Sequence, residues 1–183
     1  DFLQPWARGR ADLNLKNATK AKQRHPYEPA YNYEAGISQL VDFPIKGAIW
    51  YQGESNAQNL EAYQHAMPVL VTSWREKWGQ SFPFYYVQLS GISRPSWPYF
   101  RDMQRQLQSV IPNSGMAVSA DLGDSLDVHP TRKKEVGERL ALLALKQTYG
   151  KVGRASGPVI LSALQINDEV KLTFGEATEL KAA

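Results

Sequence analysis

Three short apolar runs alternate with three amphipathic segments in the middle of the chain, and this order limits the folds that the chain can form. The runs cover residues 46–52, 84–90 and 115–120 and lack clean alternation, which is typical of strands covered on both faces. Apolar residues recur every three or four positions in residues 60–78, 100–110 and 131–149, which predicts helices. A strand followed by a helix three times indicates right-handed crossovers and a parallel sheet.

The pattern changes near residue 157. Residues 159–166 and 170–174 predict two further strands, joined by a turn at Asn167-Asp168-Glu169. We therefore expect residues 1–156 to belong to one α/β domain and residues 157–183 to begin a β-rich segment. The length of 183 residues, 43% of them hydrophobic, is enough for a substantial core.

The composition excludes several classes of function. The chain has no cysteine, so it forms no disulfide and has no thiolate nucleophile. Basic residues number 21 and acidic residues 18, and much of the small excess lies in a polar arm over residues 1–24, so we expect no nucleic-acid partner. No apolar run approaches the roughly 20 residues of a membrane helix, and the first residues do not resemble a signal peptide, so no membrane partner is expected either.

Polar residues follow each predicted strand at its carboxyl end, in residues 52–56, 90–93 and 121–129. Ligands of parallel sheets bind beyond these ends. The three segments are therefore predicted to share one edge of the sheet and to contain the site.

Three histidines are candidates for a general base. His25 lies in the irregular basic arm and His65 in the middle of a predicted helix, whereas His129 follows a strand and three aspartates. A neutral imidazole there can accept a proton from a hydroxyl nucleophile, while Asp127 fixes its tautomer from the other nitrogen. The alternative is that the aspartates are solvated or cap the following helix.

A metal site is a second interpretation of the same segment. Asp121, Asp124, Asp127 and His129 fall within nine residues, and carboxylates suit Mg²⁺, Ca²⁺ or Mn²⁺. One imidazole and no cysteine disfavour a structural zinc site, and the spacing does not match a calcium loop. We rank this interpretation, a metal-dependent hydrolase, below acid–base catalysis and expect no metal or other cofactor.

The sequence YQGESNA, residues 51–57, offers amide donors. Gln52 and Asn56 carry NH₂ groups, and Gly53 lets backbone N–H groups approach a ligand, as an oxyanion hole requires. We expect these residues and Glu54 to bind substrate. The alternatives are a helix cap formed by Ser55 or Asn56 and a purely structural Glu54.

Four motifs together, PIKGAIWYQGESNA, PFYYVQLS, DLGDSLDVHP and GERLALLAL, closely resemble in sequence and order the sialate O-acetylesterases. These are carbohydrate esterases of the SGNH-hydrolase superfamily, and the resemblance covers about residues 26–175. It implies a three-layer α/β/α, flavodoxin-like domain, often with attached β domains. It also implies removal of O-acetyl groups from sialic acids through an acyl-serine intermediate.

The resemblance also implies roles for individual residues. His129 matches the catalytic histidine, and Gln52 and Gly53 match the block in or beside the oxyanion hole. Asp127 matches the acidic position, with Asp124 or a backbone carbonyl as alternatives for orienting the imidazole.

The nucleophilic serine of this family lies in a block upstream of every motif matched here, and this chain shows no counterpart. We therefore expect an α/β domain that is incomplete at its N-terminus and completed by an N-terminal chain or segment of the same protein. The expected substrate is an acetylated sugar or sialoglycan, and the resemblance favours a periplasmic, secreted or lumenal protein. The alternative is a non-catalytic carbohydrate-binding module that stacks sugars on Trp50, Trp97 and Tyr99.

Overall fold

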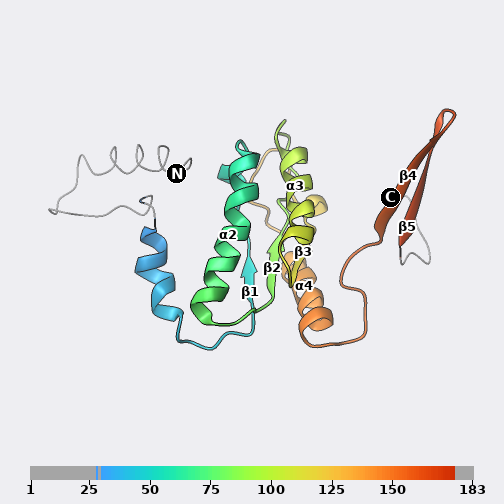
Figure 1. Cartoon of the computed structure of the whole chain (residues 1–183). Coiled ribbons are helices and arrows are strands. Elements are labelled where there is room, and N and C mark those ends of the chain that lie inside the picture. Colours follow the sequence, from blue (N-terminus) through green and yellow to red (C-terminus); the bar gives the residue numbers. More distant parts are fainter. Residues whose placement is uncertain (1–27, 29, 176–183) are drawn as a thin grey trace, which may run out of the picture.

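A parallel sheet lies at the centre of the chain in the computed structural model, which describes residue 28 and residues 30–175 (Figure 1). Its strands are β1 (Ala48–Trp50), β2 (Phe84–Val87) and β3 (Ser114–Ala117), in the order β1-β2-β3. Both neighbouring pairs are parallel, as predicted. Each strand is shorter than its apolar run, because the last residues of the run already belong to the loop that follows.

Three helices connect and follow these strands. They are α2 (Leu60–Trp78), α3 (Trp97–Val110) and α4 (Lys133–Leu143). The side chain of Asn59 caps α2, and Gly79, at φ 60°, ends it in the left-handed conformation that glycine tolerates. None of the helices in the described ranges is long and apolar enough to cross a membrane.

The helices cover both faces of the sheet, which confirms the three layers (Figure 1). Phe84 and Tyr86 of β2 pack into the core formed with α2 and α3, whereas Tyr85 and Val87 pack against residues of α4. This alternation is the period of two in a strand. All four side chains are buried, and burial of each stabilises the fold by about 1.5–3 kcal/mol.

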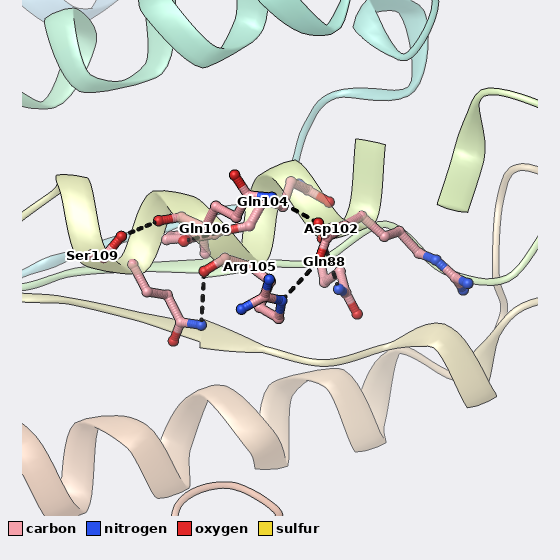
Figure 2. A network of polar contacts seen from close by, with 9 residues as sticks. Gln88, Asp102, Gln104, Arg105, Gln106 and Ser109 are labelled. Atoms are coloured by element: carbon pink, nitrogen blue, oxygen red, sulfur yellow. Dashed lines mark hydrogen bonds and ion pairs between the residues drawn. The ribbon is translucent and has the colours of Figure 1, made fainter. Parts of the chain in front are cut away.

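A buried glutamine of α3, Gln104, fixes the carboxyl end of β2, and Figure 2 shows it among the polar side chains of this helix together with Gln88. Gln104 Oε1 accepts a hydrogen bond from the Leu89 N–H at 2.9 Å, and its Nε2 donates to the Val87 carbonyl at 3.3 Å. Nearby, Gln88 Nε2 donates to the Arg101 carbonyl of the same helix at 3.0 Å. The side chains of Gln104 and Gln88 thus make hydrogen bonds that a neighbouring strand would otherwise make at the end of β2. These bonds hold the following loop in place.

Both ends of α4 depart from the prediction. The helix was expected to cover residues 131–149, but it begins at Lys133, and after Leu143 the chain continues as a wider turn over Ala144–Thr148. Tyr149, the last residue of the expected helix, is exposed. The wider turn shifts the phase of the side chains, which a pattern of constant period cannot anticipate.

The last described residues form a hairpin. Its strands are β4 (Val159–Ile166) and β5 (Glu169–Gly175), paired antiparallel as the alternation and turn residues predicted. Asn167 occupies the turn at φ 55°. The side chains of β4 are all exposed, so the hairpin contributes nothing to the core of the α/β part.

The outer strand of the sheet is incompletely covered. Within the described residues β1 pairs only with β2, and one of its edges has no neighbouring strand. Ala48 and Trp50 pack on the core under α2, whereas Ile49, which points to the opposite face, is 71% exposed. An isoleucine in the middle of a sheet strand is rarely left in water.

Candidate functional site

The three segments that follow the strands meet at one edge of the sheet, as predicted. The Ser93 N–H donates a hydrogen bond to the Ser125 carbonyl at 3.0 Å, which joins the loops after β2 and β3. These loops lie so close that a Cβ on Gly123 would be 2.3 Å from the Gly91 carbonyl oxygen. The loop after β1 is joined to them through Tyr51, which packs against the buried cluster formed by Val87 of β2, Leu122 of the third loop and Val136 of α4.

Residues 52–56, called the amide loop below, turn sharply after β1. Gly53 has φ 144°, a conformation that side-chain-bearing residues rarely adopt, and a Cβ there would lie 2.9 Å from the Phe100 ring. The Tyr63 hydroxyl donates to the Gln52 carbonyl at 3.1 Å. Burial raises the pKa of Tyr63 to about 12, so this donor stays protonated at neutral pH.

The two amide side chains of this loop are linked. Gln52 Nε2 donates to Asn56 Oδ1 at 2.6 Å, which leaves the NH₂ group of Asn56 available as a donor. Both residues line a cavity of about 190 Å³ whose apolar walls include Tyr63 and Met67. The following helix is capped by Asn59, so the alternative that Ser55 or Asn56 caps it is wrong. Glu54 begins the short helical turn Glu54–Asn56 and is half-buried.

Residues 121–129, called the histidine loop below, follow β3. His129 Nδ1 lies 3.3 Å from Asp127 Oδ1, and the same oxygen accepts a hydrogen bond from the His129 N–H at 2.8 Å. The side chains of His129 and Asp127 are 88% and 60% exposed. The carboxylate thus lies beside one ring nitrogen, which leaves Nε2 available for proton transfer.

The other aspartates of this loop have separate partners. Asp124 accepts a hydrogen bond from the Leu126 N–H, and Asp121 forms a two-pronged ion pair with Arg139 of α4 at 2.6 and 2.7 Å. The Arg139 guanidinium lowers the pKa of Asp121 below its ordinary value. The described part of the chain holds no group of three or more His, Asp or Glu side chains placed to bind a metal ion. The second interpretation, a metal site, therefore gains no support here.

The remaining candidates do not join this edge as catalytic groups. His65 is exposed on α2, and His25 lies outside the described residues. Ser90 and Ser119 are buried at the strand ends, whereas Ser55 is exposed in the amide loop. Ser119 Oγ donates to the Gln88 carbonyl, and the hydrogen-bond partner described for His129 is Asp127.

The aromatic residues proposed for sugar stacking are mostly unavailable. Trp97 is buried and donates its indole N–H to the Ser90 carbonyl at 2.8 Å, so its assignment as a stacking surface is wrong. Trp50 is half-buried against Trp74, at a ring-centre distance of 5.8 Å. Tyr99 alone of the three is mostly exposed.

Sequence reasoning missed two residues that organise this edge. Arg139 clamps the start of the histidine loop through Asp121 and also donates to the Val118 carbonyl. Tyr51 lies between the loops. The only sequence signal for either was its place within a motif, since single positions do not reveal partners about 20 or more residues away.

Comparison with known proteins places these features in a family. A family of carbohydrate esterases, the sialic acid-specific acetylesterases, matches residues 4–146. The human sialate O-acetylesterase is 32% identical over 180 residues, covering 81% of this chain and 34% of its own, and the rat protein is 31% identical. A crystal structure of a carbohydrate acetylesterase from Xanthomonas citri superposes with a TM-score of 0.68 at 35% identity, covering 74% of this chain and 33% of that one. The chain thus spans about a third of the length of these relatives.

Proposed function

Because the chain belongs to the carbohydrate esterase family of sialic acid-specific acetylesterases, we propose that it forms part of an esterase that removes O-acetyl groups from sugars. The observation that carries the proposal is the meeting at one sheet edge of the amide loop and the histidine loop, linked through Tyr51. One loop supplies hydrogen-bond donors and the other an imidazole beside a carboxylate.

His129 acts first as a base and then as an acid. Its Nε2 takes the proton of a serine hydroxyl as the serine oxygen attacks the acetyl carbon, and Asp127 stabilises the imidazolium that forms. The same proton passes to the sugar oxygen when the bond between that oxygen and the acetyl carbon breaks. A water molecule then repeats the sequence and releases acetate.

The amide loop stabilises the negative charge on the ester oxygen. Donors from the Gly53 backbone and the Gln52 and Asn56 side chains are held before the reaction by the buried turn at Gly53 and the bond from Tyr63. Loss of one such donor typically lowers the rate about 10²–10³-fold.

We further propose that the serine comes from a segment that pairs with the free edge of β1 and covers Ile49. The support is the exposure of this isoleucine at 71% and the cavity lined by Trp50 of the same strand and by Gln52 and Asn56 of the loop that follows it. Burial of one such side chain stabilises an interface by about 1.5–3 kcal/mol. A segment of the same protein is the proposed occupant.

The proposed substrate is an O-acetylated sialic acid or a sialoglycan that carries one. The support is the name of the mammalian relatives, sialate O-acetylesterase. The proposed location is periplasmic, secreted or lumenal, as the sequence resemblance implies. A non-catalytic carbohydrate-binding module is the second candidate, and exposed Tyr99 is the observation that favours it.

The test is acetate release by the complete protein from O-acetylated sialic acid, from acetylated neutral sugars and from an aryl acetate. We expect release from the first and the third, unchanged by a chelator. An alkyl fluorophosphonate, which phosphonylates activated serines with loss of fluoride, should label a serine other than Ser55, Ser90 or Ser119. Sugar binding without any acetate release would instead support the binding module.

A further inference from the structure

The hydroxyl of Tyr51 is a buried polar group that the proposed reaction does not use. Its oxygen is shielded from solvent and has no hydrogen-bond partner within the described residues. The ring packs against both cores, with Phe84 and Phe100 in one cluster and Leu122 and Val136 in the other. A buried hydroxyl without a partner costs stability, so this group does not stabilise the arrangement seen here.

Two serines at the ends of the other strands lie beside this hydroxyl. Burial raises the pKa of Tyr51 and Glu54 adds to the rise, whereas the hydroxyls of Ser119 and Ser90 lower it. Ser119 Oγ already donates its one hydrogen to the Gln88 carbonyl at 2.5 Å. Ser119 is therefore an acceptor toward Tyr51, and the phenol is the donor.

Tyr51 also touches both ends of the histidine loop. Ser119 lies two residues before this loop, and Lys133, four residues after His129, places its ammonium group 4.3 Å from the centre of the Tyr51 ring. A cation over an aromatic face is an attractive contact. Tyr51, which directly precedes Gln52, is thus attached to the chain on both sides of the histidine loop, near Ser119 before it and at Lys133 after it.

We propose that Tyr51 is a positioning residue that couples the amide loop to the histidine loop, with its hydroxyl donating to Ser119 Oγ when the two loops close on an ester. The inference rests on the proposed esterase function. Tyr51 and Gln52 are adjacent, so holding the Tyr51 ring in place also holds the direction of the hydrogen-bond donors in the amide loop. The contacts with Ser119 and Lys133 keep the His129 imidazole opposite these donors.

The test compares Tyr51→Phe with Tyr86→Phe in the complete enzyme. Both changes remove one buried hydroxyl, from the residue that directly follows β1 and from β2, but the Tyr86 hydroxyl already donates to the Gln104 carbonyl at 2.7 Å. We expect Tyr51→Phe to lower kcat for an aryl acetate about five- to tenfold with KM and the melting temperature unchanged. Tyr86→Phe should lower the melting temperature and leave kcat unchanged.

Two further measurements keep the inference separate from the proposed function. Ser119→Ala should lower kcat to a similar extent, and the double change with Tyr51→Phe should lower it no further, because both changes remove the same bond between Tyr51 and Ser119. Ser119→Ala also loses the bond to the Gln88 carbonyl, so it should lower the melting temperature as well. In complete protein that carries His129→Ala, so that the ester is not cleaved, and that is saturated with O-acetylated sialic acid, adding Tyr51→Phe should speed amide hydrogen exchange in residues 52–56 and 121–129 together, because the bond to Ser119 forms when the loops close on the ester. If the parent enzyme released no acetate, the proposed function would fail while the exchange experiment still decided the coupling. Full kcat in Tyr51→Phe, or faster exchange in the amide loop alone, would overturn the inference.

Discussion

The amide loop and the histidine loop lie at the same edge of one sheet, yet they are held in different ways. Gly53 is buried against Phe100, and the Gln52 carbonyl accepts a bond from a buried tyrosine. In the histidine loop, the Asp127 carboxylate bonds to the backbone two residues away, and both it and His129 are mostly exposed. The proposed oxyanion donors are thus fixed by the core, whereas the proposed base is fixed by local bonds and by anchors at the ends of its loop.

This difference indicates where each half of the site is vulnerable. Changes in the core should damage the donors together with the stability of the fold, because the same packing supports both. Changes in the histidine loop should damage catalysis with little loss of stability, because exposed side chains contribute little to folding. Three substitutions test this contrast.

The largest combined effect is expected for Gly53→Ala. The new Cβ would collide with the Phe100 ring, and φ 144° is strained for alanine, so we expect a loss of about 2–4 kcal/mol in the free energy of unfolding and at least a 10²-fold loss of kcat. Urea denaturation and aryl acetate turnover measure the two.

The matched control is Gly137→Ala on α4, where a Cβ meets nothing within 4 Å. Alanine should stabilise this helix by about 1 kcal/mol and leave kcat unchanged. Equal stability of the Gly53 variant and the parent would contradict a fixed amide loop.

A smaller effect is expected for Gln104→Leu, which removes the side-chain partners of Leu89 and Val87 while keeping a similar volume. Leaving two buried peptide groups unpaired should cost about 2 kcal/mol in the free energy of unfolding. Gln108→Leu on the exposed side of α3, where the side chain bonds only to the Arg105 carbonyl, is the control and should cost less than about 0.5 kcal/mol. Similar costs for both would show that the end of β2 does not depend on α3.

The smallest effect is expected for Asp121→Asn. The hydrogen bonds from Arg139 lower the pKa of Asp121 below 3.8, so this pair stabilises the fold above that pH and the contribution disappears as the pH falls through the lowered pKa. Because the pair is exposed, we expect a cost of about 0.5 kcal/mol at pH 7 that vanishes in strong acid. Urea midpoints measured between pH 7 and pH 2 check both parts, and a cost independent of pH would contradict the ion pair.

Periodic patterns predicted the elements of this fold well. The helix over Leu60–Trp78 was predicted to the residue, because one apolar stripe runs along it and Gly79 marks its end, whereas its cap, Asn59, was not predicted. The strands were placed correctly but too long. The edge that bears His129 and Gln52 followed from the rule for carboxyl ends of parallel strands.

Contacts between distant residues could not be predicted in the same way. Trp97 was predicted to be a stacking surface for sugars, yet its ring is buried, and its indole N–H donates to the Ser90 carbonyl. The partnership of Arg139 with Asp121 spans 18 positions and leaves no periodic signal. Helix packing decides which distant side chains bond to the loops at this edge of the sheet. Local sequence patterns do not contain that information.

The most direct test of the esterase mechanism is aryl acetate turnover by the complete enzyme with His129→Ala, compared with His65→Ala on the exposed side of α2. We expect the first change to lower kcat by at least about 10³-fold with an unchanged melting temperature, and the second to alter neither quantity. A His129→Ala enzyme that kept most of its turnover would contradict the assignment of His129 as the base. It would also contradict the proposal that the histidine loop supplies the base while the amide loop supplies the oxyanion donors.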